Sequence, residues 1–148
     1  MATINAYINF EGNCEEAFNY YKGVFGVEFS MLNRFSEMPP QEGMELSEAD
    51  MNKIMHVSMP ISKETMLMGS DVGGEWAQGL QFGNNITLSI TAESKEEADD
   101  FFNKLSEGGK VTMPMDMTFW GSYFGMCSDK FNINWMISFG EAPKEAGN

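Results

Sequence analysis

The amino-acid sequence predicts an α+β fold in which tandem βαβββ modules form a curved, eight-stranded mixed sheet with the helices outside. Apolar and polar residues alternate over 3–10 and again over 85–91, as they do in half-buried strands. A helix start and an amphipathic pattern follow each strand, so the strand–helix pair recurs after about 80 residues. Further strand candidates complete each half. Because such a half leaves one sheet face uncovered, we expect the halves to share a concave inner face.

Each expected element rests on a local signal. Asn13 with Glu16 resembles a capping box, and Gly26 ends the helix that follows. The same kind of cap recurs at Ser94. The expected elements are strands over 3–10, 27–35, 53–61 and 64–70 with a helix over 13–25, then strands over 85–91, 110–117, 119–128 and 131–139 with a helix that ends before Gly108.

Two connections separate these elements. The acidic segment 36–52 contains a Pro-Pro pair and is expected to be solvated, with one helical turn near its end. Segment 71–83 has four glycines and is expected to be a long connection, either a linker or a functional loop. We therefore expect a single domain over 1–148 made of two modules, about 1–70 and 84–140.

The last third of the chain predicts a β-hairpin. Asp129 can start the turn, and Asn132 accepts a left-handed backbone more readily than most residues. In the strand that follows, Phe131, Ile133, Trp135, Ile137 and Phe139 alternate with Asn132, Asn134, Met136 and Ser138. One face is therefore apolar and the other mainly polar, and the polar face is where we expect a binding site.

Composition argues against several partners. Nine Lys plus Arg against 22 Asp plus Glu give a formal charge of −13, which repels nucleic acid and anionic lipid. No apolar run approaches the roughly 18 residues that span a membrane. Cys14 is expected in the core on a helix face and Cys127 in a strand, and both are expected to be reduced thiols of a cytoplasmic protein. The 14 methionines favour either plastic core packing or an adaptable pocket lining.

The tandem βαβββ plan resembles the vicinal-oxygen-chelate superfamily, which includes glyoxalase I, bleomycin-resistance proteins and extradiol dioxygenases. A closer resemblance is to its PhnB-like branch, often labelled 3-demethylubiquinone methyltransferase-like. The matching stretches are Glu11-Gly12-Asn13-Cys14-Glu15-Glu16-Ala17, Tyr21-Lys22 through Phe25-Gly26, Trp120-Gly121 through Phe124-Gly125, and Asp129-Lys130-Phe131 with Trp135-Met136. Asn132 stands where the branch usually has glycine. The resemblance implies a homodimer, and nothing in the sequence resembles a glycine motif for a methyl donor.

In metal-using members, the resemblance implies four inward His or Glu ligands, one each from the first and last strands of each half. Matched by spacing, the positions here are Asn5, Met66 or Met68, Asn85 and Met136. None of these side chains suits Zn²⁺, Ni²⁺ or Fe²⁺, and the chain has one His. We therefore expect no catalytic metal and predict no cofactor. His56 with Glu64 or Asp71 forms the residual metal candidate.

His56 is the best candidate for a catalytic residue, as a general base or a hydrogen-bond donor, although a lone strand histidine is more often structural. By strand parity it shares the polar face with Ser58. The candidate ligand-binding residues are Asn5, Tyr7, Asn9, His56, Met66, Met68, Asn85, Ser89, Trp120, Tyr123, Asn134 and Met136. Aromatic rings with polar tips suit a small, partly apolar ligand, while the alternative role of Trp120 is core packing.

Three interpretations follow. The first is a metal-free, dimeric small-molecule-binding protein of the glyoxalase/bleomycin-resistance type, with an unknown, partly aromatic or amphipathic ligand. The second is a metal-dependent lyase, isomerase or dioxygenase of the same superfamily. The third is a dimer whose pocket is filled by its own methionines and takes no ligand.

Overall fold

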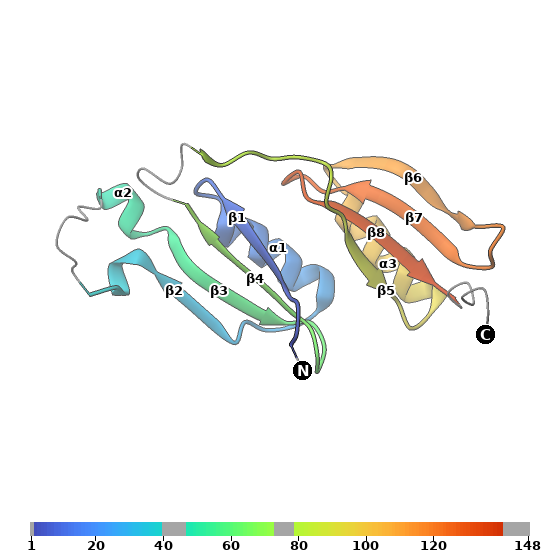
Figure 1. Cartoon of the computed structure of the whole chain (residues 1–148), viewed down its shortest axis with the longest axis horizontal. Helices are drawn as coiled ribbons and strands as arrows, with labels where there is room; N and C mark the ends of the chain where they lie inside the picture. Colours follow the sequence, from blue (N-terminus) through green and yellow to red (C-terminus); the bar gives the residue numbers. More distant parts are fainter. Residues whose placement is uncertain (1, 40–46, 73–78, 141–148) are drawn as a thin grey trace. The chain divides into compact units, whose positions relative to one another are not determined.

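The structure is a computed structural model that describes residues 2–39, 47–72 and 79–140 of the 148-residue chain. The chain divides into two compact units, Met1–Gln81 and Phe82–Asn148. Each unit contains one βαβββ module, so the predicted tandem arrangement is confirmed (Figure 1). No helix in the described part of the chain is long and apolar enough to cross a membrane.

The first unit builds its sheet from strands that are distant in sequence. It contains β1 (Ala6–Phe10), α1 (Cys14–Phe25), β2 (Met31–Arg34), the 3₁₀ helix η1 (Phe35–Glu37), α2 (Glu48–Met51), β3 (Ile54–Pro60) and β4 (Met66–Asp71). The strand order is β1-β4-β3-β2, in which β1 pairs parallel with β4 and the other pairs are antiparallel. Helix α2 confirms the helical turn expected near the end of 36–52. Residues 40–46 of that connection lie outside the described residues.

The second unit repeats this topology. It contains β5 (Leu88–Thr91), α3 (Lys95–Ser106), β6 (Lys110–Met117), β7 (Tyr123–Ser128) and β8 (Asn134–Phe139), in the order β5-β8-β7-β6. Ser94 caps α3 as predicted, by accepting a hydrogen bond from the backbone N–H of Glu97 at 3.0 Å. The described strands thus form two four-stranded sheets, whereas we expected one eight-stranded sheet.

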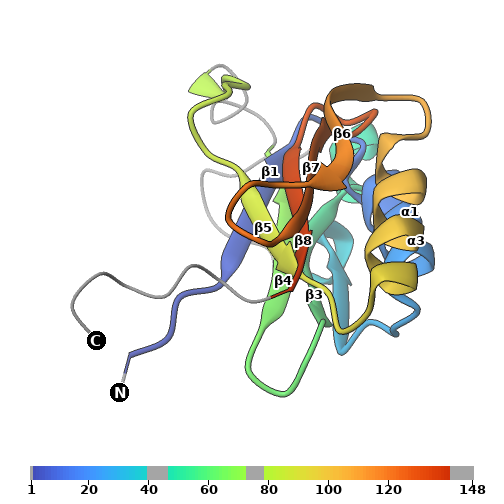
Figure 2. The same ribbon diagram turned by 90° about the vertical axis from the view of Figure 1, so that its right-hand side faces the viewer.

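Each helix covers one face of its own sheet (Figure 2). In the first unit, a Cβ added at Gly69 would lie 2.6 Å from the ring of Phe18 on α1. Glycine at this position therefore lets the helix approach the sheet closely. In the second unit, the buried residues Trp135 and Ile137 share a face with Tyr123, whose hydroxyl bonds to α3. Among the described residues, the opposite face of each sheet carries no helix of its own unit, and we call it the helix-free face.

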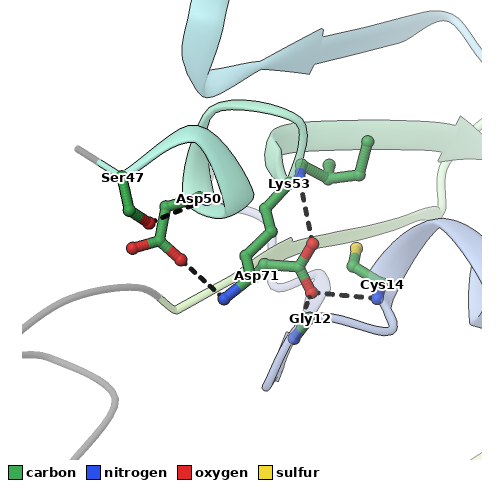
Figure 3. Close-up of polar contacts among 7 residues, drawn as sticks. Gly12, Cys14, Ser47, Asp50, Lys53 and Asp71 are labelled. Carbon is green, nitrogen blue, oxygen red and sulfur yellow. Dashed lines mark hydrogen bonds and ion pairs between the residues drawn. The ribbon is translucent and has the colours of Figure 1, made fainter.

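The start of α1 is held by a side chain from the end of the sheet. Asn13 makes no side-chain capping hydrogen bond, so the predicted capping box is wrong. Instead, Oδ1 of Asp71 accepts from the N–H groups of Gly12 at 2.8 Å and Cys14 at 2.9 Å (Figure 3). Oδ2 of the same carboxylate accepts from the N–H of Ile54 at 2.9 Å. A carboxylate here also suits the positive end of the helix dipole.

The turn between β7 and β8 matches its prediction. Asn132 adopts a left-handed backbone with φ of 66°. Oδ1 of Asp129 accepts from the N–H of Phe131 at 2.8 Å and of Ile133 at 3.1 Å. Its Oδ2 accepts from the indole N–H of Trp135 at 2.8 Å, so one buried carboxylate organises the whole turn.

Three strands of the second unit begin later than we expected: β8 begins at residue 134 where we expected 131, and β5 and β7 also begin late. β5 begins at residue 88. In the segment before it, the carbonyl oxygens of Gly83 and Ile86 accept hydrogen bonds from the Asn134 side-chain amide, both at 3.4 Å, instead of from a neighbouring strand. β7 begins at residue 123, because 118–122 form a turn closed by the Thr118 N–H on the Ser122 carbonyl at 2.9 Å. The late starts of β5 and β7 leave Asn85 and Trp120 outside the strands in which we expected them.

Candidate functional site

The helix-free face of the first sheet carries a row of four side chains, which we call the tyrosine row. Tyr7, Met68, Ser58 and Met31 lie opposite one another on β1, β4, β3 and β2. Directly opposed residues in neighbouring strands point to the same face. Since Gly69, the next residue of β4, faces α1, the tyrosine row points away from that helix.

The neighbouring row is polar throughout, and we call it the histidine row. It consists of Asn9, Ser70, His56 and Asn33 on the same four strands, and the β3–β4 register places His56 opposite Ser70. Ser70 Oγ donates to Asn9 Oδ1 at 3.4 Å. At the β2 end, Asn33 Nδ2 donates to Glu37 Oε2 at 3.1 Å. The row thus offers amide, hydroxyl and imidazole groups on one surface.

A hydrogen bond joins the two rows. The hydroxyl oxygen of Tyr7 lies 3.2 Å from Nδ1 of His56, with the ring centroids 5.6 Å apart. These residues belong to β1 and β3, so the tyrosine reaches across β4, a span of about 10 Å for two strand spacings. Tyr7 is 44% exposed, which leaves its ring available to a ligand. The structure therefore brings together two residues that the sequence placed on one face.

The position of the proton between the Tyr7 hydroxyl and His56 Nδ1 decides whether Nε2 can donate a hydrogen bond to a ligand or accept one from it. When the Tyr7 hydroxyl donates to Nδ1, neutral His56 carries its proton on Nε2 and can donate from it. When Nδ1 holds the proton, the hydroxyl oxygen accepts, and Nε2 of the neutral ring is an acceptor. Within the described residues, Nε2 has no hydrogen-bond partner of its own. The pair can therefore either donate to or accept from a bound molecule.

Two more candidates lie beside these rows. Met66 begins β4 and shares the face of Met68 by parity. Asn5 precedes β1, and its Oδ1 accepts from the backbone N–H of Met66 at 3.0 Å. The Asn5 side chain therefore helps to hold β1 against β4, which occupies one of its oxygen acceptor positions.

In the second unit, three candidates lie on the helix-free face. Ser89 on β5 lies opposite Met136 on β8, and Asn134 precedes Met136 by two residues. Asn134 Oδ1 accepts from Ser128 Oγ at 2.7 Å. Beside it is an open depression of about 540 Å³, lined by Phe82, Gly83, Asn84, Ser128, Asn132 and Asn134. These lining side chains carry no formal charge.

The other three candidates lie elsewhere. Asn85 is in the bend before β5 and is exposed. Trp120 is in the β6–β7 turn, 40% exposed, with its ring 6.1 Å from that of Phe124. Tyr123 faces α3, where its hydroxyl donates to Asp99 Oδ1 at 2.5 Å, and this bond raises the pKa of Tyr123. Asn85 and Trp120 precede the strands in which we expected them, whereas Tyr123 lies on β7 but on the face that α3 covers.

Sequence reasoning also missed residues of these faces. Asn33 and Ser70 complete the histidine row, yet neither was a candidate. Ser70 follows Met66 and Met68 at intervals of two, so parity within its own strand was a usable signal. Asn33 had no such signal, because only the pairing of β2 with β3 places it opposite His56.

The described residues do not fit the metal site of metal-using superfamily members. Within 2–39, 47–72 and 79–140, no three His, Cys, Asp or Glu side chains lie close enough to hold a metal ion. Asp71 faces away from His56, and both its oxygens accept from backbone N–H groups. Glu64 lies in the turn after β3. His56 lies four residues before Pro60, the last residue of that strand, which is a distance of roughly 13 Å along the strand.

The thiols are not reactive candidates. Cys14 and Cys127 are both free and buried, and burial was predicted for Cys14. Burial raises the pKa of both, to about 11 for Cys127. At neutral pH both thiols therefore stay protonated and unreactive.

The pKa of the Glu37 carboxylate is lowered, because it accepts hydrogen bonds from the Arg34 backbone and the Asn33 amide.

Known proteins resemble this chain over nearly its whole length. The family model described as 3-demethylubiquinone-9 3-methyltransferase matches residues 2–138. Protein YjdN of Escherichia coli K12 is 30% identical over 141 residues, which cover 91% of this chain and 93% of YjdN. The solved structure of protein PA1353 from Pseudomonas aeruginosa matches this chain with a TM-score of 0.80 and 32% sequence identity. The match covers 96% of this chain and 100% of PA1353.

Other solved structures share the fold. The PhnB protein of Bacillus cereus has a TM-score of 0.72 and 25% identity, with 94% of this chain and 100% of that chain covered. A glyoxalase/bleomycin resistance protein/dioxygenase family enzyme from Burkholderia phytofirmans PsJN has a TM-score of 0.62 at 15% identity, with 90% and 96% covered. At that identity the likeness concerns the fold alone.

Proposed function

The chain belongs to the PhnB-like 3-demethylubiquinone-9 3-methyltransferase family and shares its fold with a glyoxalase/bleomycin resistance/dioxygenase family enzyme, and from this premise we propose that it is a metal-free small-molecule-binding protein. The proposed ligand is small and partly aromatic or amphipathic. It binds on the helix-free face of the first sheet, against Tyr7 and His56. The observation that carries this proposal is the hydrogen bond between these side chains across β4.

The chemistry of the two rows supports a ligand of mixed polarity. Met68 and Met31 of the tyrosine row give an adaptable apolar surface, which suits aromatic and aliphatic groups. Asn9 and Ser70 of the histidine row give neutral hydrogen-bonding groups beside it. Because Tyr7 is already held by its bond to the imidazole, it loses less conformational freedom when a ligand arrives.

A ligand screen by thermal denaturation, followed by calorimetry on the hits, tests this proposal. The library should contain small aromatic and amphipathic molecules. Tyr7→Phe keeps the ring and removes the hydroxyl, so we expect Kd for a hit to rise by about tenfold, which corresponds to roughly 1.4 kcal/mol.

Tyr123→Phe is the matched control, because it also removes a phenol hydrogen bond but on the face that α3 covers. We expect this variant to bind hits as tightly as the unchanged protein. The proposal is contradicted if no compound raises Tm, or if Tyr7→Phe and Tyr123→Phe weaken binding equally.

The metal-dependent lyase, isomerase or dioxygenase is the alternative function. It needs a donor set that the described residues do not bring together. We expect elemental analysis of protein purified without a metal-affinity tag to find Zn, Ni, Fe and Mn far below one atom per chain. A stoichiometric metal that is lost in His56→Ala would favour the enzyme.

We also propose a homodimer located in the cytoplasm. The exposed apolar side chains of Val111 and Met117 on β6 support an association that would cover these two residues. The free thiols of Cys14 and Cys127 suit a reducing compartment. Sedimentation velocity at micromolar concentration is expected to give the mass of two chains, and a monomer mass would contradict the dimer.

A further inference from the structure

The helix-free face of the second sheet carries three methionines side by side. Ser89, Met136, Met126 and Met113 lie opposite one another on β5, β8, β7 and β6, and we call the last three the methionine row. Opposed Cβ atoms on neighbouring strands are about 5 Å apart, so those of Met136 and Met113 are about 10 Å apart. Because each sulfur lies two bonds beyond its Cβ, the side chains of Met113 and Met136 can extend toward Met126.

Irregularities in β6 turn Met113 toward this face. The register of β6 against β7 shifts on both sides of Met113. Before the first shift, Val111 lies opposite Cys127, which is buried in the core. After it, Met115 approaches Gly125 so closely that a Cβ there would lie 2.5 Å from its sulfur. Of Val111, Met113 and Met115, Met113 alone therefore lies on the helix-free face. A β-bulge commonly changes the face to which a single side chain points in this way.

The methionine row is accessible, unlike a core methionine. Met113 is 46% exposed, whereas Met59 is fully buried at 0%. Met126 and Met136 are half-buried, so their thioethers are neither sealed in the core nor fully hydrated. Packing alone does not require three adjacent methionines at a surface.

Three thioethers select soft, monovalent metal ions. Thioether sulfur is a neutral soft ligand that favours Cu(I) and is a poor ligand for Mg²⁺ or Ca²⁺. The formal charge of −13 draws cations to the protein. Asp116 lies opposite Phe124 in the next row of the same face, which adds a nearby carboxylate. Beyond the proposed function, whose ligand face uses no metal, we propose that Met113, Met126 and Met136 form a Cu(I) site on the helix-free face of the second sheet.

The first sheet shows why the site belongs to the second sheet alone. Its equivalent row has Met68 and Met31, but Ser58 stands between them. Two methionines with a strand between them cannot supply three neighbouring sulfurs. Met31 is also 51% exposed, so it makes a matched control for the accessible methionines of the second sheet.

The first test uses Ag(I), which resembles Cu(I) in its ligand preference and does not change oxidation state in air. Protein with ¹³C-labelled methionine methyl groups is titrated with silver nitrate and followed by NMR. We expect the methyl signals of Met113, Met126 and Met136 to shift together up to one equivalent, while that of Met31 stays in place. Shifts confined to other methionines would overturn the proposal.

The second test measures Cu(I) affinity by competition with a chromophoric chelator, without oxygen and with ascorbate to keep copper reduced. Met126→Leu conserves volume and should fold, which circular dichroism verifies. Because it removes the central ligand, we expect its Cu(I) affinity to fall by about 10–100-fold or more. Met31→Leu is expected to keep the original affinity. Equal affinity in the unchanged protein and Met126→Leu would refute the site.

Discussion

Replacing Asp71 with Asn tests whether one buried carboxylate joins helix α1 to its sheet. Asp71 is 3% exposed and accepts hydrogen bonds from the N–H groups of Gly12, Cys14 and Ile54. An asparagine amide has one oxygen and one NH₂ group. If its oxygen serves Gly12 and Cys14, its NH₂ group faces the Ile54 N–H, and two donors meet.

The size of the effect follows from these contacts. A buried donor left without a partner costs about 1–3 kcal/mol, and removing the charge from the helix N-terminus costs about 0.3–1 kcal/mol more. We therefore expect Asp71→Asn to lower the free energy of unfolding by about 1–4 kcal/mol in a urea titration followed by circular dichroism.

Asp100→Asn is the matched control, because its carboxylate is 53% exposed and lies in an ion pair with Lys104 on the surface of α3. We expect this variant to stay within about 0.5 kcal/mol of the unchanged protein. The reasoning is refuted if Asp71→Asn also stays within that range while the slope of the transition is unchanged.

Three further predictions concern stability. Gly69→Ala should lower the free energy of unfolding by about 1–3 kcal/mol, because the new methyl meets the Phe18 ring at 2.6 Å, whereas Gly23→Ala, with nothing within 4 Å, should raise it in the same urea titration. Asn132→Gly should raise it by up to about 1 kcal/mol, since its φ is 66°, and a decrease would contradict this. Burial raises the pKa of Cys127 from 9.0 to about 11, so the folded protein keeps a proton that the unfolded chain loses. Stability should therefore fall as pH rises from 9 to 11, and Cys127→Ala should flatten this slope.

The fold could be predicted because its signals are local. Alternation over 3–10 and 85–91 involves residues within a few positions of one another and occurs in both halves, and the Ser94 cap of α3 is equally local. The Asp129 and Asn132 turn was predictable for the same reason, since its hydrogen bonds stay within six residues.

The remaining features depend on contacts between distant residues. Asn13 has the sequence of a helix cap, but Asp71, at the end of β4, binds the backbone there instead. Asn85 was expected on β5, but the Asn134 side chain binds the segment before that strand. No local pattern encodes such pairings.

The candidate site was predictable only in part for the same reason. Parity placed Tyr7 and His56 on one face, and the structure brings them to 3.2 Å. Met136 was a candidate, but the row of three methionines was not predictable, because two register shifts in β6 decide that Met113 lies opposite Met126. Parity counted along β6 gives the wrong face after each shift.

Imidazole ¹⁵N NMR of His56 during titration with a ligand from the thermal screen tests the central claim most directly. The chain has one histidine, so the spectrum reports this residue alone. We expect both ring nitrogens to shift in a saturable way with the Kd that calorimetry gives, and Tyr7→Phe to move the midpoint to higher ligand concentration. Saturable binding by calorimetry with unchanged His56 signals would contradict the account and place the ligand elsewhere.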